Sequence, residues 1–184
     1  MAKIILTILI LFFMISCNHS DNQQQRELGL KEKGLMSKEK ELSATTKELD
    51  RGQIPITAAV KIAQDQFRNY LPKILDSHNA ILDLQKSYTG DFTGDGIEDV
   101  AIYFSLARKE GGNALAGQGL SLYQNNGKSV KVVAGFEPDY LFSFDKISGG
   151  NIYVNKLEYA ENDGRCCPSI KIKHRLTING NKAY

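Results

Sequence analysis

The spacing of hydrophobic and polar residues changes twice along this chain. An apolar run fills positions 4–15, and a polar segment that alternates Lys and Glu follows as far as residue 53. Apolar residues then recur at helical spacing on one stripe, formed by Val60, Ala63, Phe67, Tyr70 and Leu71. From about Ala80 the period becomes two, which is typical of strands.

The stripe predicts one helix ahead of the strands. Thr57 is the expected N-cap, because a threonine hydroxyl can accept a hydrogen bond from an amide of the first turn. Pro72 is expected to stop or kink the helix near Leu71, since proline lacks an amide donor.

Alternation predicts strands from about Ala80, over 100–106 and at about 118–124, 129–135, 140–147, 151–159 and 169–178. Residues 125–128 and 148–151 have the composition of hairpin turns. Short strands joined by tight turns build antiparallel sheets, and the helix must bury its stripe against one. The expected fold class is α+β, with one helix packed on an antiparallel β-meander of about five to seven strands, preceded by a charged helical tail.

The apolar run at the N-terminus follows Lys3 and ends at Ile15-Ser16-Cys17. It spans about 12 residues, too few for the roughly 17 to 25 of a membrane-spanning helix, and it fits the core of a signal peptide. The segment resembles a bacterial lipobox, with Met14 where leucine is usual. That resemblance implies a mature protein that starts at Cys17 and carries covalent lipid such as palmitate there. The alternative is an uncleaved hydrophobic anchor.

These features predict three parts: a signal peptide at 1–16, a charged helical tether at 17–53 and a globular domain at 54–184. Either form of the N-terminus places the domain outside the cytoplasm, beside a membrane. Asn18 stands where some lipoproteins carry the aspartate that retains them at the inner membrane, so the resemblance implies the outer membrane.

The tether has a seven-residue period, set by Leu28, Leu35, Leu42 and Leu49. A coiled coil needs two apolar positions per heptad, and here the second position holds Lys, Glu or Thr. We therefore expect a spacer helix, and an oligomerising coil is the alternative. The whole chain has 23 basic and 21 acidic residues, a balance that does not favour a nucleic-acid partner.

The acidic segment 91–99 is the motif best suited to bind a metal ion. Asp91, Thr93, Asp95, the Ile97 carbonyl and a bidentate Asp99 would supply about six oxygen ligands, as calcium prefers, and Gly96 permits a sharp turn. An EF-hand would need Glu where Ile102 stands. The alternative is a tight Asp and Gly turn without metal.

The same segment resembles the D-x-D-x-D-G-x-x-D loop of FG-GAP and VCBS-type repeats, which also runs into a strand, and the chain has one copy of it. The resemblance implies that Asp91, Asp95 and Asp99 are side-chain ligands and Ile97 a backbone ligand. Thr93 replaces the usual Asp or Asn, so the expected affinity is weak, about 10⁻⁴ to 10⁻³ M. A propeller of such repeats needs several blades, and the chain is too short for one.

Two cysteines stand side by side, Cys166 and Cys167. Adjacent Cα atoms lie about 3.8 Å apart, below the usual range for a disulfide. A strained ring between them is expected, while a bond to another chain or two free thiols are the alternatives. His174 shares the apolar positions of the last strand and is expected to be a packed core histidine rather than a metal ligand.

No nucleophile elbow, zinc-protease motif or Walker loop is present in the sequence. A hydrolase would have to use carboxylates such as Glu98, Asp139, Glu158 and Glu161. The other hypothesis, which we favour, is a non-catalytic module that binds an envelope protein or glycan. The aromatic stripe of Tyr140, Phe142 and Phe144 with Tyr153, Leu157 and Tyr159 is expected to be core, and a binding platform for such a partner is the alternative.

The order of these motifs, from the lipobox through the acidic turn to Cys-Cys-Pro-Ser before the last strand, is similar to that of small bacterial lipoproteins of the LppP/LprE type, a group of uncharacterised function. The resemblance implies a folded envelope domain and brings no catalytic residues with it.

Overall fold

The computed structural model describes residues 33–40, 42–43, 46, 52–111, 115–164 and 166–184. The chain forms two compact units, Met1–Lys47 and Glu48–Tyr184, each considered by itself. In the first unit residues 33–40 are helical, as the tether prediction requires, and Leu35 and Leu42 are exposed. The signal peptide, Cys17, Leu28 and Leu49 lie outside the described residues. Among the described helices none is long and apolar enough to cross a membrane.

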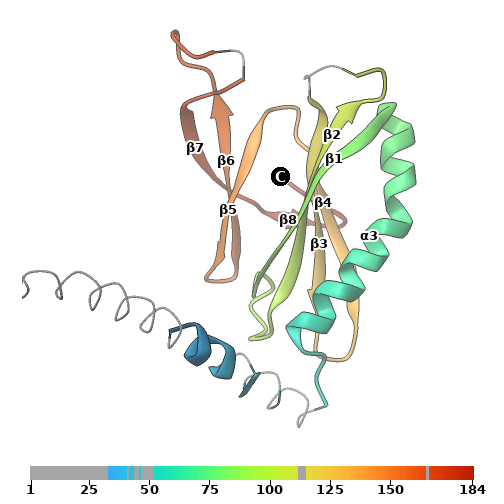
Figure 1. Ribbon diagram of the computed structural model, residues 1–184, viewed down its shortest axis with the longest axis vertical. Helices are drawn as coiled ribbons and strands as arrows, with labels where there is room; N and C mark the ends of the chain where they lie inside the picture. Colours follow the sequence, from blue (N-terminus) through green and yellow to red (C-terminus); the bar gives the residue numbers. More distant parts are fainter. Residues whose placement is uncertain (1–32, 41, 44–45, 47–51, 112–114, 165) are drawn as a thin grey trace, which may run out of the picture. The chain divides into compact units, whose positions relative to one another are not determined.

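The second unit has three layers, which are a helix, a larger sheet and a smaller sheet (Figure 1). The larger sheet has the order β1-β2-β3-β4-β9-β8 and the smaller one β5-β6-β7. The elements are α3 (Ile56–His78), β1 (Ala80–Gly90), β2 (Asp99–Arg108), β3 (Leu115–Asn125), β4 (Val130–Phe136), β5 (Phe142–Ser148), β6 (Asn151–Glu158), β7 (Ile170–Arg175), β8 (Ile178–Asn179) and β9 (Lys182–Ala183).

The class is therefore mixed α+β, but the expected single meander is wrong in detail. The strands divide into two stacked sheets, and β4 pairs with β9 in parallel. The division lies between β4 and β5, where the chain leaves one sheet and starts the other. A single sheet of this size would leave one face of β2 and β3 uncovered, whereas the second sheet buries it.

Strand β2 shows how the layers are joined, since both of its faces are buried. Val100, Ile102 and Phe104 face the helix and form one core with Ala63 and Phe67. On the opposite face Ala101 pairs with Leu122, and Tyr103 pairs with Leu120. These residues pack against the smaller sheet, in a core that includes Phe142, Ile152 and Val154. Rings meet across the layers, with Tyr103 and Phe142 edge to face at 5.7 Å.

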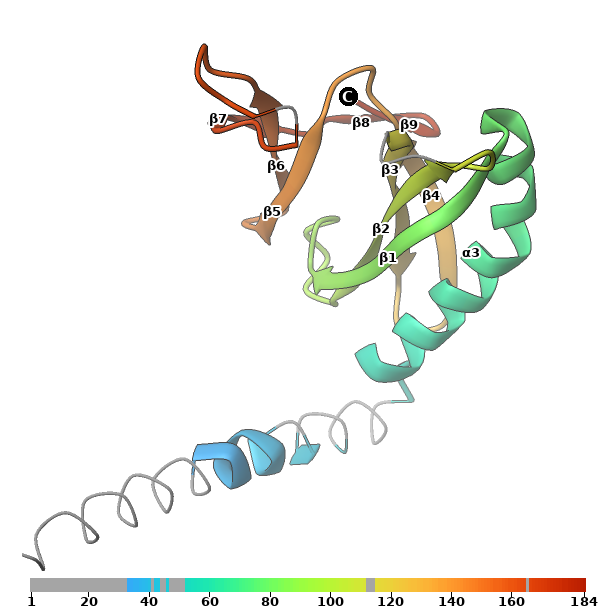
Figure 2. The same ribbon diagram turned by 45° about the horizontal axis from the view of Figure 1, so that its top comes forward.

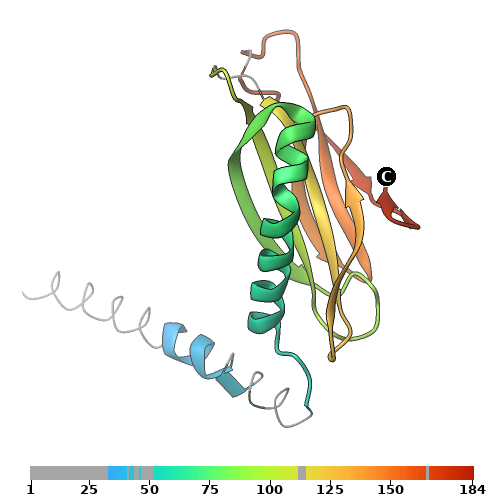
Figure 3. The ribbon, with the colours of Figure 1, turned by 90° about the vertical axis from the view of Figure 1, so that its right-hand side faces the viewer.

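Helix α3 runs along one face of the larger sheet (Figure 3) and continues past Pro72 to His78. The expected stop at Pro72 is wrong, and so is the cap, because Pro55 precedes the helix and no side chain caps it. Pro72 is exposed, so water can reach the carbonyl that loses its donor. Ile74 and Leu75 continue the buried stripe beyond it, and their packing favours a longer helix. The helix ends at His78, and the next residue, Asn79, caps it with a left-handed backbone conformation, with φ of 46°.

The two predicted hairpin turns are confirmed. Residues 126–129 join β3 to β4, and 149–150 join β5 to β6. In the first turn Asn126 accepts hydrogen bonds from the amides of Lys128 and Ser129, and Gly127 takes the left-handed φ of 79° that glycine allows.

The C-terminal segment returns from the smaller sheet to the edge of the larger one (Figure 2). Leu176 is buried in the core between the sheets, and its amide donates to Ile152. Strands β8 and β9 then form a short hairpin, and the Gly135 amide of β4 donates to the Asn181 carbonyl at 3.0 Å. This hairpin builds one wall of the cleft described below.

Candidate functional site

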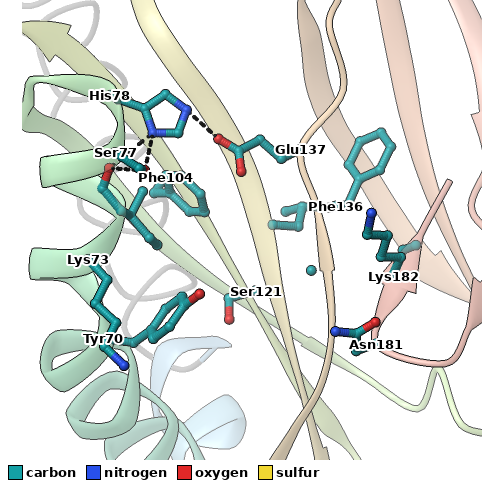
Figure 4. Close-up of a pocket in the computed structure, with 14 residues that line it drawn as sticks. Tyr70, Lys73, Ser77, His78, Phe104, Ser121, Phe136, Glu137, Asn181 and Lys182 are labelled. Atoms are coloured by element: carbon teal, nitrogen blue, oxygen red, sulfur yellow. Dashed lines mark hydrogen bonds and ion pairs between the residues drawn. The ribbon is translucent and has the colours of Figure 1, made fainter.

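A cleft of about 500 Å³ lies between the C-terminal half of α3 and the strands β3, β4 and β9. Figure 4 shows residues of α3 on one side, residues near β4 and β9 on the other, and Ser121 of β3 between them. Its volume falls in the range of small-molecule sites. We call it the helix–sheet cleft. It is lined by Tyr70, Lys73, Ile74, Ser77, His78, Phe104, Leu120, Ser121, Gly135, Phe136, Glu137, Asn181, Lys182 and Ala183.

The cleft is open on the side of the sheet at Gly135, which carries no side chain. Gly135 pairs with Ser121, so both face the helix. A Cβ built on Gly135 would meet no atom within 4 Å, whereas one on the nearby Gly119 would lie 2.6 Å from the Phe104 ring. The space above Gly119 is therefore filled by the Phe104 ring, whereas the space above Gly135 is open.

His78 and Glu137 connect the two walls at one end of the cleft. His78 is the last residue of α3, and its Nε2 lies 2.7 Å from Oε1 of Glu137, just after β4. Its Nδ1 lies 3.0 Å from the Ile74 carbonyl and 3.0 Å from the Ser77 hydroxyl, which itself donates to that carbonyl. The two ring nitrogens of His78 therefore contact polar groups on α3 and after β4.

The polar groups of the cleft converge from separate elements. Lys73 and Tyr70 come from α3, and the Lys73 ammonium lies 5.7 Å from the centre of the Tyr70 ring. Asn181 and Lys182 lie across the cleft from them (Figure 4). Two ammonium groups thus stand on opposite walls, while Glu137 is the single carboxylate of the lining and is paired with His78. The arrangement suits an anionic group between the walls, with apolar contacts from rings such as Phe104.

A second hollow of about 400 Å³ continues along β4 and shares Tyr70, Ser121, Gly135 and Asn181 with the first. Val132 of β4 lies in it and is 59% exposed. Helix α3 therefore leaves the β4 side of the sheet face partly uncovered, and the cleft has an apolar extension.

Sequence reasoning did not identify this cleft. Tyr70 was expected on the buried stripe, yet it is 55% exposed and lines the cleft. Asn181 and Lys182 lie beyond the last predicted strand. The available signal was the Asn179-Gly180 pair, a hairpin motif, and Gly180 does take a φ of 61°.

The acidic loop is held by hydrogen bonds from its own backbone. Asp91 accepts from the amides of Gly94 and Gly96, at 2.6 and 2.9 Å, and Asp95 accepts from the Ile97 amide. Asp99 is fully buried, whereas Asp95 is exposed. The structure thus brings Asp91 and Asp95 into one turn and assigns Asp99 to anchoring it.

Asp99 accepts four hydrogen bonds. Oδ2 accepts from the amides of Phe92 and Thr93 and from the Thr93 hydroxyl, and Oδ1 accepts from the Asn125 amide. Burial raises the pKa of Asp99, and the hydrogen bonds from Asn125, Thr93 and Phe92 offset part of that rise. Both oxygens of Asp99 accept hydrogen bonds here, so bidentate binding of calcium by Asp99 would compete with these bonds. Calcium at the loop stays a prediction.

The structure pairs Cys166 with Cys167, with Cα atoms 3.8 Å apart, in an exposed turn. Asp163 closes this turn by accepting from the amides of Ala160 and Ser169, both at 2.7 Å. These hydrogen bonds lower the pKa of Asp163. The arrangement matches the expected ring between neighbouring cysteines, and their redox state stays a prediction.

The proposed hydrolase carboxylates do not meet in the cleft, since Glu98, Asp139, Glu158 and Glu161 are all absent from its lining. Glu158 instead pairs with Lys156 at 2.8 Å.

His174 is half-buried and its Nδ1 lies 2.9 Å from the Tyr140 hydroxyl. Strand β7, which corresponds to the last strand predicted from the sequence, is less buried than expected. Ile170 and Ile172, on the same face as His174, are 42% and 45% exposed. Within the part of the chain that the structure describes, no group of three or more His, Cys, Asp or Glu is placed to hold a metal ion.

The predicted aromatic platform divides between two faces of the smaller sheet. Tyr140, Phe142 and Phe144 pack into the core between the sheets. Tyr153 and Leu157 alternate with the buried Ile152 and Val154, so they face outward. Phe142 and Phe144 pair with Lys156 and Val154, so Tyr153 and Leu157 lie on the opposite face, and the β-bulge at Asp145 shifts the register only beyond Phe144. The core interpretation therefore holds for Tyr140, Phe142 and Phe144, and the stripe does not form one platform.

In comparisons with protein-family models, curated proteins and solved structures, nothing matches this chain.

Proposed function

We propose that this protein is a non-catalytic binding module of the bacterial cell envelope, tethered to the membrane by lipid at Cys17, that holds a small anionic ligand in the helix–sheet cleft. The open position at Gly135, between two walls that each carry a lysine, is the observation that supports the proposal. The lipid tether rests on the N-terminal sequence, whose apolar run ends at a cysteine.

The chemistry of the cleft suits recognition. Lys73 and Lys182 supply positive charge, Ser121 and Asn181 supply neutral donors, and Ile74 and Phe104 supply apolar surface. A ligand with one carboxylate or phosphate and a short apolar part would use all three kinds of contact. The side chains come from α3, β2, β3, β9 and the β8–β9 turn, so binding would depend on the complete fold.

The lining favours binding over hydrolysis. Carboxylate-dependent hydrolysis uses two carboxyl groups that act as acid and base or nucleophile. Glu137 is the single carboxylate among the residues that line the cleft, and its Oε1 is paired with His78. The His78–Glu137 pair is suited to closing one end of a binding site.

The experiment is a ligand screen on the compact unit Glu48–Tyr184, which contains both hydrophobic cores. A panel of small carboxylates and phosphate esters is titrated while amide shifts are followed by NMR. Binding should shift Ser121, Gly135 and Asn181, and Gly135→Val should abolish it, because the valine side chain occupies the open space without contacting protein atoms at Cβ.

Lys73→Gln should weaken binding about tenfold, the cost of one charge-assisted contact. Lys131→Gln is the matched control, since Lys131 is exposed on β4 and does not line the cleft. Equal binding by the wild type and the stable Gly135→Val variant would overturn the cleft as the site.

The tether is tested in the bacterial cell by metabolic labelling with a palmitate analogue. The full-length chain should incorporate label and sediment with the membrane fraction, and Cys17→Ser should do neither. An unlabelled wild-type chain would remove the lipid anchor from the proposal and leave the cleft untouched.

Calcium is the remaining proposed ligand, at the acidic loop. If it binds with a Kd in the expected weak range, a few millimolar calcium should stabilise the domain by about 1 to 2 kcal/mol. Asp95→Ala should lose this effect. No shift in melting temperature in either protein would leave the loop a hydrogen-bonded turn.

A further inference from the structure

The outward face of the smaller sheet collects positive charge. Its inner face is set by Val154, which packs in the core between the sheets. Alternation along β6 then directs Tyr153, Asn155 and Leu157 outward, and their partners on β7 are Arg175, Lys173 and Lys171. Lys146 of β5 joins them, because it pairs with Tyr153 and its ammonium lies 5.8 Å from the ring centre. We call this surface the cationic face.

The cationic face has four basic groups and one acid. The acid is Asp145, whose carboxylate lies 3.5 Å from the Lys173 ammonium. In the whole chain basic and acidic residues are nearly balanced, at 23 and 21. The net charge of the chain is therefore small, but basic side chains are concentrated on this face. Their local positive field attracts anionic partners.

We propose that the cationic face docks on the surface of an anionic lipid bilayer. The basic groups lie on the two outer strands β5 and β7, and Tyr153 and Leu157 of β6 lie between them. Charges spread over two dimensions match a plane of lipid headgroups better than they match a linear polyanion. Tyrosine is suited to the membrane interface, because its ring is apolar and its hydroxyl polar. The long lysine stems can lie along Leu157 while the ammonium groups reach the headgroups.

The proposed lipid tether would hold this face near a bilayer, and the docking can be tested without it. Cations on an exposed edge strand such as β7 also discourage pairing with other sheets. Membrane docking and protection of the sheet edge predict different outcomes when the basic residues of β7 are replaced.

The test uses the chain from Asn18 to Tyr184, which keeps every described residue and lacks the lipid site. Vesicles of phosphatidylethanolamine with about one third phosphatidylglycerol are compared with vesicles of neutral phosphatidylcholine, by co-sedimentation. Binding to the anionic vesicles only, which weakens with added salt, is expected.

Each basic residue near the surface adds about fivefold in partitioning, which corresponds to about 1 kcal/mol. Lys171→Gln/Arg175→Gln should therefore reduce binding about 25-fold. The matched control is Lys61→Gln/Lys131→Gln, which removes the same charge from exposed positions on α3 and β4. Asp145→Asn should strengthen binding about fivefold, a gain that misfolding cannot produce.

Three outcomes would overturn the proposal: equal losses in the two double variants, binding to a soluble polyanion such as heparin with none to vesicles, or unchanged vesicle binding with self-association of Lys171→Gln/Arg175→Gln. The last would assign the charges to edge protection. Because the cleft lies on the other side of the larger sheet, failure here leaves the ligand screen unaffected.

Discussion

Replacing Asp99 by Asn tests whether the acidic loop is held by its own hydrogen bonds. The change keeps the size of the side chain but replaces one acceptor oxygen with a donor. If the amide oxygen takes the place of Oδ2, which serves Phe92 and Thr93, the new NH₂ group faces the amide of Asn125. Two donors then meet in a site with no solvent exposure.

The cost follows from these contacts. One buried backbone donor without an acceptor costs about 1 to 3 kcal/mol, and the remaining bonds lose the benefit of a charged acceptor. Relief from burying a charge offsets part of this, since burial raises the pKa of Asp99. We expect a net loss of about 2 to 4 kcal/mol, a large part of the roughly 5 to 15 kcal/mol that stabilises a domain.

The assay is urea unfolding of the unit Glu48–Tyr184 in EDTA at neutral pH, with the melting temperature as a second measure. The melting temperature should fall by on the order of 10 °C. Asp95→Asn is the control, because Asp95 is exposed and asparagine keeps its bond from the Ile97 amide. It should change the free energy of unfolding by less than about 0.5 kcal/mol.

A loss below about 1 kcal/mol for Asp99→Asn in EDTA would refute this reasoning. If calcium then stabilised the wild type and not the variant, the metal would be the organiser of the loop.

Two further predictions concern the larger sheet. Burial raises the pKa of Tyr123 above 10.0, so its stabilising contribution is complete below that pH and is lost as the pH rises through the folded-state pKa. Tyr123→Phe should therefore lose less stability than the wild type between about pH 8 and about pH 11, as measured by urea midpoints; equal losses would contradict it. Gly119→Ala should cost about 1 to 3 kcal/mol, because its Cβ would lie 2.6 Å from the Phe104 ring and 2.8 Å from the Phe136 carbonyl oxygen. Gly135→Ala, with open space at Cβ, should be neutral or slightly stabilising in the same assay, and equal costs for the two variants would show that the sheet is not open at Gly135.

Local patterns alone were enough to predict most elements of the domain. Alternation located seven strands, since a strand exposes its two sides in turn, and the residues of the two hairpin turns suit the backbone that a turn requires. The stripe before them predicted the helix. Local sequence also contains the segment that resembles a lipobox and the acidic turn, because each depends on neighbouring residues.

Tertiary structure decided how these elements are layered and where the candidate site lies. Whether Pro72 ends the helix depends on what Ile74 and Leu75 pack against beyond it. The bulge in β5 and the return of β9 to β4 are set by packing between distant segments. The helix–sheet cleft is lined by residues between positions 70 and 183, which come from α3, several strands and the C-terminal hairpin. Such a site has no signature along the chain, because its spacing exists only in the folded molecule.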